Sequence, residues 1–150
     1  MDDIDRRLLS ELQSDGRMTN QDLAKRINLS AAACFDRVKR LRESGVIKGY
    51  TAILDPVALG LPLIIFVEVF LEKTTREMCE AFTGAIRKAP EVLECHMVAG
   101  GFDYLIKARV RDMAAYRVFL GETLMEMPGI RETRTYAVLE EIKATTELPL

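Results

Sequence analysis

The stretch TNQDLAKRINLSAAACFDRVKRL (Thr19–Leu41) holds two short amphipathic helical patterns. The segment Ile27–Ser30 separates them and breaks the regular spacing of the apolar side chains. Two short helices joined by a tight turn are typical of a helix-turn-helix, whose second helix fits into the major groove of DNA. We therefore predict that this stretch belongs to a small DNA-binding domain.

A further helix is expected before this pair. Ile4, Leu8 and Leu12 recur every four residues, and the acidic residues near the start suit the positive end of a helix dipole. Thr19 and Ser30 are placed to cap the second and third helices. The N-terminal part of the chain is therefore predicted to fold as a winged-type helix-turn-helix of three helices.

This domain is expected to occupy residues 1–49, because Gly45 is a typical helix stop and the chain after it becomes extended. Residues 50–62 are predicted to be a linker with an extended strand. The segment Tyr50–Leu54 alternates like a strand, so we expect it to pair with the same segment of another copy.

The third helix carries a stripe that is expected to be buried, formed by Cys34, Val38 and Leu41. Outside this stripe, Arg37 and Arg40 are expected to reach guanine edges or phosphates, and the small alanines before them allow close approach to the bases. The alternative is a solvated charged face without a ligand. The predicted DNA-contacting residues are Ser30, Ala31, Ala32, Ala33, Arg37, Lys39 and Arg40.

The charge is divided unequally along the chain. Residues 1–50 carry ten Lys and Arg against eight Asp and Glu, whereas residues 51–150 carry eleven against fifteen. The positive potential is therefore local to the predicted helix-turn-helix. One copy is expected to bind DNA weakly and with strong salt dependence, which favours an oligomer.

Several classes of protein are not indicated. The N-terminus is charged, and the longest apolar run, Leu59–Val67, is too short to cross a bilayer, so a cytoplasmic protein without a membrane partner is expected. The cysteines Cys34, Cys79 and Cys95 are widely spaced, which favours buried thiols over disulfides or a zinc site. No metal and no cofactor are expected.

From Leu63 onward the apolar residues recur with a period of two, which predicts a strand. The rest of the chain indicates helix, strand, strand, helix and strand in turn. This order is typical of an α+β domain, a ferredoxin-like βαββαβ unit whose four-stranded antiparallel sheet carries both helices on one face. We predict this domain at residues 63–150, with its open face covered by a second copy.

The second helix of this domain is expected to begin after Asp112, which is placed to cap it. The final strand is predicted over Ile130–Ile142. The side chains expected on the inner side of the helix are Met113, Tyr116, Leu120 and Leu124.

No catalytic constellation is visible, and an enzyme is not predicted. His96 is the only histidine, and alternation places it beside Glu94 and Val98 on one face, where an interface or surface role is favoured over catalysis. No serine or cysteine has an evident base partner.

The segment Met97–Tyr104 is a candidate ligand site. Gly100 and Gly101 leave backbone N–H groups unobstructed for a carboxylate, and Asp103 is a possible partner for an ammonium group. Hydroxyl groups and apolar lining are expected from Thr133, Thr135, Met97, Met113, Tyr136 and Val138. Together they suit a zwitterionic amino acid, although an ordinary hairpin turn remains the alternative.

The chain resembles the leucine-responsive and asparagine-type (Lrp/AsnC) family of bacterial and archaeal regulators. The residues that carry the resemblance are IDRRLLSELQSDGRMTN, LAKRINLS, CFDRVKRLRESGVIKGYTA, ECHMVAGGFDYLIKARVRDMAAYRVFLGETL and MPGIRETRTYAVLEEIK, which together span nearly all of the chain. The resemblance implies a C-terminal domain that dimerises, assembles typically into octamers, and often binds amino acids between dimers.

Carried over by motif, the effector-binding residues are Met97, Ala99, Gly100, Gly101, Asp103, Tyr104, Met113, Thr133, Thr135, Tyr136 and Val138. We expect a sequence-specific transcriptional regulator that binds double-stranded DNA and is modulated by leucine or another apolar amino acid. Two alternatives stay open. One is an architectural protein that wraps DNA without an effector, and the other is an enzyme similar to the siroheme decarboxylases.

Overall fold

The computed structural model describes residues 1–150, which divide into two compact units. One unit consists of Met1–Ile53 together with Lys143–Leu150, and the other of Leu54–Ile142. We call the first the head and the second the C-terminal domain. None of the helices is long and apolar enough to span a bilayer.

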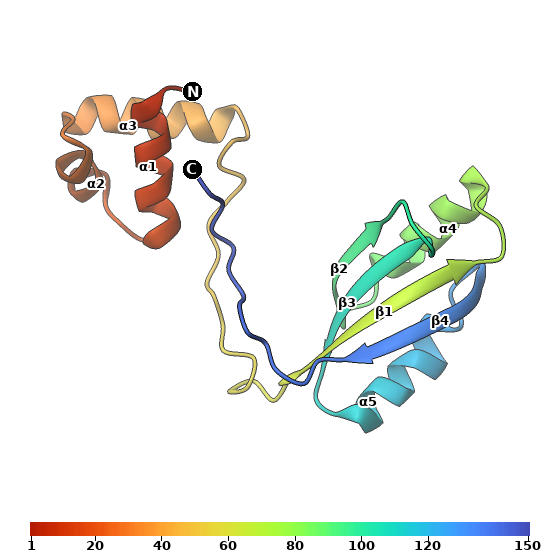
Figure 1. The fold of residues 1–150 in the computed structure, drawn as a ribbon. Coiled ribbons are helices and arrows are strands. Elements are labelled where there is room, and N and C mark those ends of the chain that lie inside the picture. The colour runs from red at the N-terminus through yellow and green to blue at the C-terminus, as the bar shows by residue number, and fades with distance from the viewer. The chain divides into compact units, whose positions relative to one another are not determined.

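The head consists of three helices, α1 (Asp3–Ser14), α2 (Asn20–Ile27) and α3 (Ala31–Glu43), which are shown in Figure 1. The side chains of Thr19 and Ser30 cap α2 and α3 by accepting hydrogen bonds from backbone N–H groups, as predicted. The core of the head is formed by the buried side chains Leu8, Leu9, Leu23, Ala24, Ile27, Cys34, Val38 and Leu41.

The turn between α2 and α3 depends on Asn28, which adopts a left-handed conformation with φ of 57°. Asparagine tolerates this region better than most residues, so it ends α2 without a glycine. At the end of α3, Gly45 has φ of 75°, which confirms the predicted helix stop. Asn28 therefore shapes the turn between α2 and α3, and Gly45 ends α3.

The segment after α3 forms no strand in the single chain. Residues 50–62 contain only coil and a turn near Pro56–Gly60, because no backbone of the same chain offers them a ladder of hydrogen bonds. Their predicted pairing with the same segment of another copy stays a prediction.

The C-terminal domain contains a four-stranded antiparallel sheet with strand order β2-β3-β1-β4. Figure 1 shows this order of strands in the sheet. Along the chain the elements follow the predicted order βαββαβ. The elements are β1 (Leu63–Leu71), α4 (Arg76–Ile86), β2 (Val92–Met97), β3 (Tyr104–Val110), α5 (Met113–Val118) with the π-helical segment η1 (Phe119–Leu124), and β4 (Ile130–Ala137).

The core of this domain lies between one face of the sheet and its helices. The alternation of β1 directs Ile65, Val67 and Val69 to this face, and all three are fully buried. Phe82 of α4 and Tyr116 of α5 pack in the same cluster. The other face of the sheet carries Phe66 and Glu68 of β1, which are partly exposed.

The inner side of α5 differs from the prediction. Met113 is 51% exposed, while Phe119 is 2% exposed and replaces it in the core. Phe119 lies three residues after the buried Tyr116 and shares its side of the helix, whereas Met113 lies in the first turn of α5 and stays exposed. From Phe119 to Leu124 the chain is π-helical, and both of these residues are buried.

The final strand is shorter than predicted. It ends at Ala137, which pairs with Ile65 near the start of β1. Beyond this point only the Val138 N–H reaches β1, at 3.0 Å from the Ile64 carbonyl. The alternating pattern of Val138–Ile142 therefore has no partner strand, because β1 begins at Leu63.

Candidate functional site

The two arginines predicted to read DNA are held by acidic residues of α1. Nη1 of Arg37 donates hydrogen bonds to both carboxylate oxygens of Asp2, at 3.0 and 2.8 Å, and to Oδ1 of Asp5 at 2.8 Å. Nη2 of Arg40 donates to both oxygens of Asp5, at 2.9 and 2.8 Å. The prediction treated these side chains as free, whereas the structure shows them in a cluster with two carboxylates.

The carboxylates of Asp2 and Asp5 also accept hydrogen bonds from each other's backbone N–H groups. The N–H of Asp5 donates to Asp2 at 2.8 Å, and the N–H of Asp2 donates to Asp5 at 3.2 Å, which forms a capping box at the start of α1. Burial of Asp5 opposes its ionisation, but the hydrogen bonds from Arg37 and the Asp2 N–H prevail and lower the pKa of Asp5 below 3.8. The hydrogen bond from the Asp5 N–H, together with Arg37, lowers the pKa of Asp2 in the same direction.

A lowered pKa predicts how the protein responds to acid. A carboxylate whose pKa falls on folding adds stability above its unfolded value and loses it as the pH falls through the folded value. We expect the free energy of unfolding to decrease as the pH drops below about 3.8, and to decrease less steeply in Asp5→Asn. Chemical denaturation followed by circular dichroism, from about pH 2.5 to about pH 6, measures both slopes. Equal slopes in the two proteins would contradict the assignment.

Three basic residues in and just after the second half of α3 are uncommitted, because no acidic residue holds them closely. Arg42 and Lys48 make no ion pair within the chain, and Lys39 is 3.9 Å from Glu43 with both side chains well exposed. An exposed pair at this distance contributes little, so Lys39 remains available to a ligand. Sequence reasoning included Lys39 among the DNA contacts but omitted Arg42 and Lys48.

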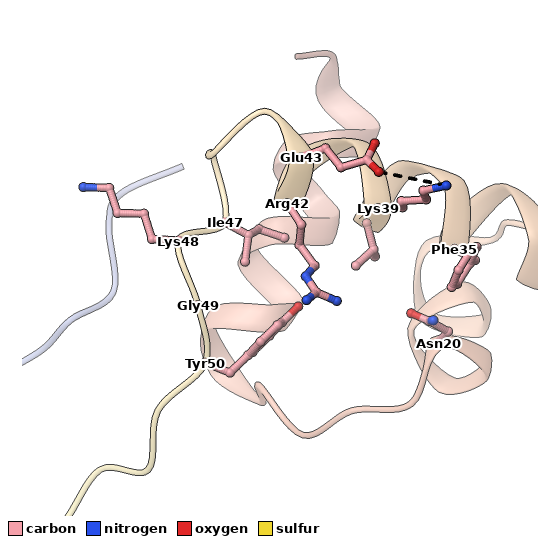
Figure 2. A pocket seen from close by; sticks show the side chains of 10 residues that line it. Asn20, Phe35, Lys39, Arg42, Glu43, Ile47, Lys48, Gly49 and Tyr50 are labelled. Atoms are coloured by element: carbon pink, nitrogen blue, oxygen red, sulfur yellow. Dashed lines mark ion pairs between the residues drawn. The ribbon is translucent and has the colours of Figure 1, made fainter.

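These residues line or border a hollow of about 680 Å³ on the head. Figure 2 shows Arg42 in the middle, with Ile47 and Tyr50 on one side of it, Phe35 and Asn20 on the other, and Lys48 extending away from them. Phe35 is 52% exposed and lies outside the buried stripe of α3. The hollow combines apolar walls with cationic groups, which suits the sugar-phosphate backbone of a nucleic acid.

The N-terminal end of α3 offers small side chains to solvent. The Ser30 hydroxyl accepts a hydrogen bond from the Ala33 N–H at 3.2 Å and caps the helix. Ala31 and Ala32 are exposed, and Ala33 is half-buried. This geometry permits the close approach to base edges that the sequence predicted.

In the C-terminal domain, Asp103 connects three strands. Its Oδ2 accepts a hydrogen bond from the Leu71 N–H at 2.8 Å, its own N–H donates to the Val69 carbonyl, and its carbonyl accepts from the Val98 N–H. One carboxylate oxygen is therefore engaged in the fold, and the other makes no hydrogen bond within the chain.

The glycines of the β2–β3 turn are open to solvent. A side chain added at Gly100 or Gly101 would meet nothing within 4 Å, and neither residue has a positive φ. The left-handed residue of an alternating anion nest is therefore not formed there in the single chain. The local fold does not require glycine at either position.

One chain does not bring all the predicted effector residues together. Met97 and Thr133 lie in the same cross-strand row, but β3 and β1 separate them, which places them about 14 Å apart at the usual strand spacing. Tyr136 pairs with Phe66 on the open face of the sheet, opposite to the face of Thr133 and Thr135. The predicted residues therefore form separate groups.

Two of the predicted effector residues also have partners within the domain. Tyr104 is 2% exposed and packs on Phe82, with ring centroids 4.7 Å apart, and burial raises its pKa to about 12. The Thr135 hydroxyl lies 2.6 Å from the hydroxyl of Tyr116. Tyr104 is thus a core residue, while Thr135 is exposed and its hydroxyl keeps capacity for further hydrogen bonds.

No cluster of His, Cys, Asp and Glu is suited to hold a metal ion. His96 is exposed, with Nε2 3.2 Å from the Glu94 carboxylate, and Glu94 also accepts a hydrogen bond from Lys107 at 3.1 Å. The hydrogen bond from His96, followed by that from Lys107, lowers the pKa of Glu94. These contacts describe an ion-pair network on the sheet.

Comparison with known proteins accounts for both units. The Lrp/AsnC ligand binding domain matches residues 64–148, and a winged helix-turn-helix DNA-binding domain matches residues 1–48. The leucine-responsive regulatory protein of Salmonella typhimurium is 50% identical over 148 residues, which make up 99% of this chain and 90% of that protein. This chain belongs to the Lrp/AsnC family.

Solved structures of the family have the same fold over the full length. A transcriptional regulator of Neisseria meningitidis, solved as a complex with L-Met, superposes with a TM-score of 0.94 at 38% identity and covers 99% of this chain and 96% of its own. An AsnC family regulator of Agrobacterium tumefaciens gives 0.95 at 36% identity, covering 99% and 97%. The chain is therefore a DNA-binding transcriptional regulator of the Lrp/AsnC family.

Proposed function

We propose that this regulator binds double-stranded DNA in a sequence-specific manner through its head and that a small apolar amino acid modulates the binding from the C-terminal domain. The observation that supports the first part is the uncommitted cationic group Lys39, Arg42 and Lys48, which lies in and just after the C-terminal half of α3, while the start of the same helix exposes small side chains. The site of action is the cytoplasm, where such regulators meet DNA.

The second part rests on the family of the C-terminal domain and on one relative. The domain matches the Lrp/AsnC ligand binding domain, and the Neisseria meningitidis regulator was solved with L-Met. Leucine or another apolar amino acid is the proposed effector. Asp103 offers an unoccupied carboxylate oxygen for the ammonium group, and the Gly100–Gly101 turn offers open backbone for the carboxylate.

The effector is proposed to bind between copies of the chain. The separation of Met97 from Thr133 and the opposite orientations of Thr135 and Tyr136 mean that one chain cannot direct all of these groups at one small molecule. A homodimer that assembles to an octamer would combine the turn of one copy with β4 of another. An amino acid in such a site favours one assembly over another only if it binds the two with different affinity.

Replacing Asp103 separates the role in binding from the role in the fold. Asp103→Asn keeps an oxygen for the Leu71 N–H but loses the negative charge, so we expect amino-acid affinity to fall by about 10- to 100-fold with little change in stability. Asp103→Ala is expected to lose the affinity and also about 1–2 kcal/mol of stability. Isothermal titration and chemical denaturation measure the two quantities.

The matched control for this pair is Glu126→Gln, which removes an exposed carboxylate of the same domain. It is expected to change neither quantity, and DNA binding without effector should be the same in all three variants. An Asp103→Asn protein that binds the amino acid as well as the wild type does would remove Asp103 from the site.

The proposed function is tested by a thermal-shift panel of all twenty amino acids on the full chain. A ligand that binds the folded state raises the melting temperature by mass action. We expect a concentration-dependent rise with one or a few apolar amino acids. A flat panel alongside intact DNA binding would support an architectural protein that wraps DNA without an effector.

A further inference from the structure

We propose that Asp5, assisted by Asp2, is a positioning residue for DNA sequence readout. It holds the guanidinium groups of Arg37 and Arg40 in fixed orientations and neutralises them, so that these arginines contribute base recognition rather than general attraction to phosphate. The inference rests on the proposed DNA binding by the head and assigns a specificity role to residues outside the recognition helix.

The geometry leaves part of each guanidinium free. Arg37 makes its hydrogen bonds to the carboxylates through Nη1 alone, and Arg40 through Nη2 alone. Nε and Nη2 of Arg37 therefore remain as donors, as do Nε and Nη1 of Arg40. A guanidinium whose orientation is already fixed loses less conformational entropy when its remaining N–H groups pair with a guanine edge.

Asp5 is the fixed point of this cluster because it is 1% exposed. It lies three and four residues before the buried Leu8 and Leu9, so the apolar face of α1 carries the carboxylate into the packing between α1 and α3. A buried carboxylate is strongly unfavourable unless it is paired. Asp5 therefore holds the arginines more firmly than an exposed acid would.

The charges of the cluster explain how affinity and specificity are divided. Two carboxylates meet two guanidinium groups within hydrogen-bonding distance, so the cluster adds no net charge to the head. Bases outside the cluster, such as Lys39, Arg42 and Lys48, are left to supply the attraction to phosphate that does not depend on sequence. Recognition of the DNA bases and electrostatic attraction to phosphate thus come from different residues.

The test compares specific and nonspecific binding at several salt concentrations. The full chain and its variants are titrated with a duplex that the wild type selects from a random-sequence pool, and with a scrambled duplex of the same composition. Asp5→Asn releases Arg40 and removes one negative charge. We expect it to bind scrambled DNA more tightly, with a salt slope steeper by about 0.9 for each additional phosphate that is neutralised, while the ratio of specific to nonspecific affinity falls about tenfold or more.

Asp2→Asn gives a second variant that is expected to fold, because asparagine caps helices well and Asp2 is more than half exposed. It weakens only the hold on Arg37, so the ratio is expected to fall less than in Asp5→Asn. The matched control is Asp3→Asn, which removes the same charge from an exposed residue of α1 that makes no ion pair. Its specificity ratio should equal that of the wild type.

A purely structural role for Asp5 would weaken binding to both duplexes together. Tighter binding of Asp5→Asn to scrambled DNA would therefore exclude a purely structural role. The inference is overturned if Asp5→Asn and Asp2→Asn keep the wild-type ratio, or if Asp3→Asn lowers the ratio as much as they do. If the wild type itself selects no duplex and binds none, the proposed DNA binding fails, and this inference fails with it. If the wild type selects a duplex but Asp5→Asn and Asp2→Asn keep its ratio of specific to nonspecific affinity, only the positioning role is refuted and the proposed DNA binding stands.

Discussion

Replacing Phe82 with alanine is expected to lower the free energy of unfolding of the C-terminal domain by about 3–5 kcal/mol. Phe82 is completely buried and is the largest of the fully buried side chains. It packs on Tyr104 of β3 and therefore joins α4 to the centre of the sheet. A loss of this size approaches the whole stability of many domains.

Urea denaturation followed by circular dichroism measures this loss, since the chain has no tryptophan to report by fluorescence. The matched control is Val118→Ala, because Val118 lies on α5 of the same domain but is 52% exposed. We expect the control to change the unfolding free energy by less than about 0.5 kcal/mol. Similar losses in both proteins would contradict the packing of α4 described above.

Replacing Lys39, Arg42 and Lys48 together with alanine is expected to weaken binding to any duplex, on the order of 100-fold at low salt. If each of these bases neutralises one phosphate, the slope of log affinity against log salt becomes shallower by about 0.9 for each base that is removed. Fluorescence anisotropy with labelled duplexes over a range of salt concentrations measures both effects. The ratio of specific to nonspecific affinity should change little, unlike in Asp5→Asn.

A triple variant of the C-terminal domain provides the control. Lys73, Arg87 and Lys88 are exposed and make no ion pair, so their replacement by alanine removes the same charge from the chain. We expect this replacement to leave DNA binding nearly unchanged. If this control weakened binding as much as the head variant, overall charge rather than the surface of the head would be responsible.

Local features of the fold could be predicted from the sequence with accuracy. Thr19 and Ser30 cap their helices through side-chain oxygens, and Asp112 does the same for α5. Capping needs only a residue type and its position before an apolar pattern. The period of two in β1 likewise identified the core face of the sheet, because alternation directly determines which side chains share a face.

Features that depend on contacts distant in sequence were missed. Arg37 and Arg40 were treated as free because their partner Asp5 lies on another helix, and its burial arises from the packing of α1 on α3. A signal was present: Asp5 lies on the same helical face as Leu8 and Leu9. The burial of Phe119 was missed as well, although its spacing of three residues from Tyr116 places both on the same side of a helix.

The effector residues illustrate a different limit. Their types suit an amino acid, and the family motif predicts them, but β3 and β1 lie between β2 and β4 and keep the predicted residues of these two strands apart in one chain. A sequence pattern identifies which groups are available and does not fix how copies assemble. Assembly depends on the shape and chemistry of whole surfaces.

The central claim is that an amino acid bound by the C-terminal domain changes the affinity of the head for DNA. The most direct measurement is the dissociation constant of the wild-type protein for its selected duplex, by anisotropy, with and without saturating L-Leu or L-Met. We predict a change of about 5- to 150-fold with at least one apolar amino acid, and the same factor in amino-acid affinity when DNA is added. Unchanged DNA affinity with an amino acid shown to be bound would contradict the account.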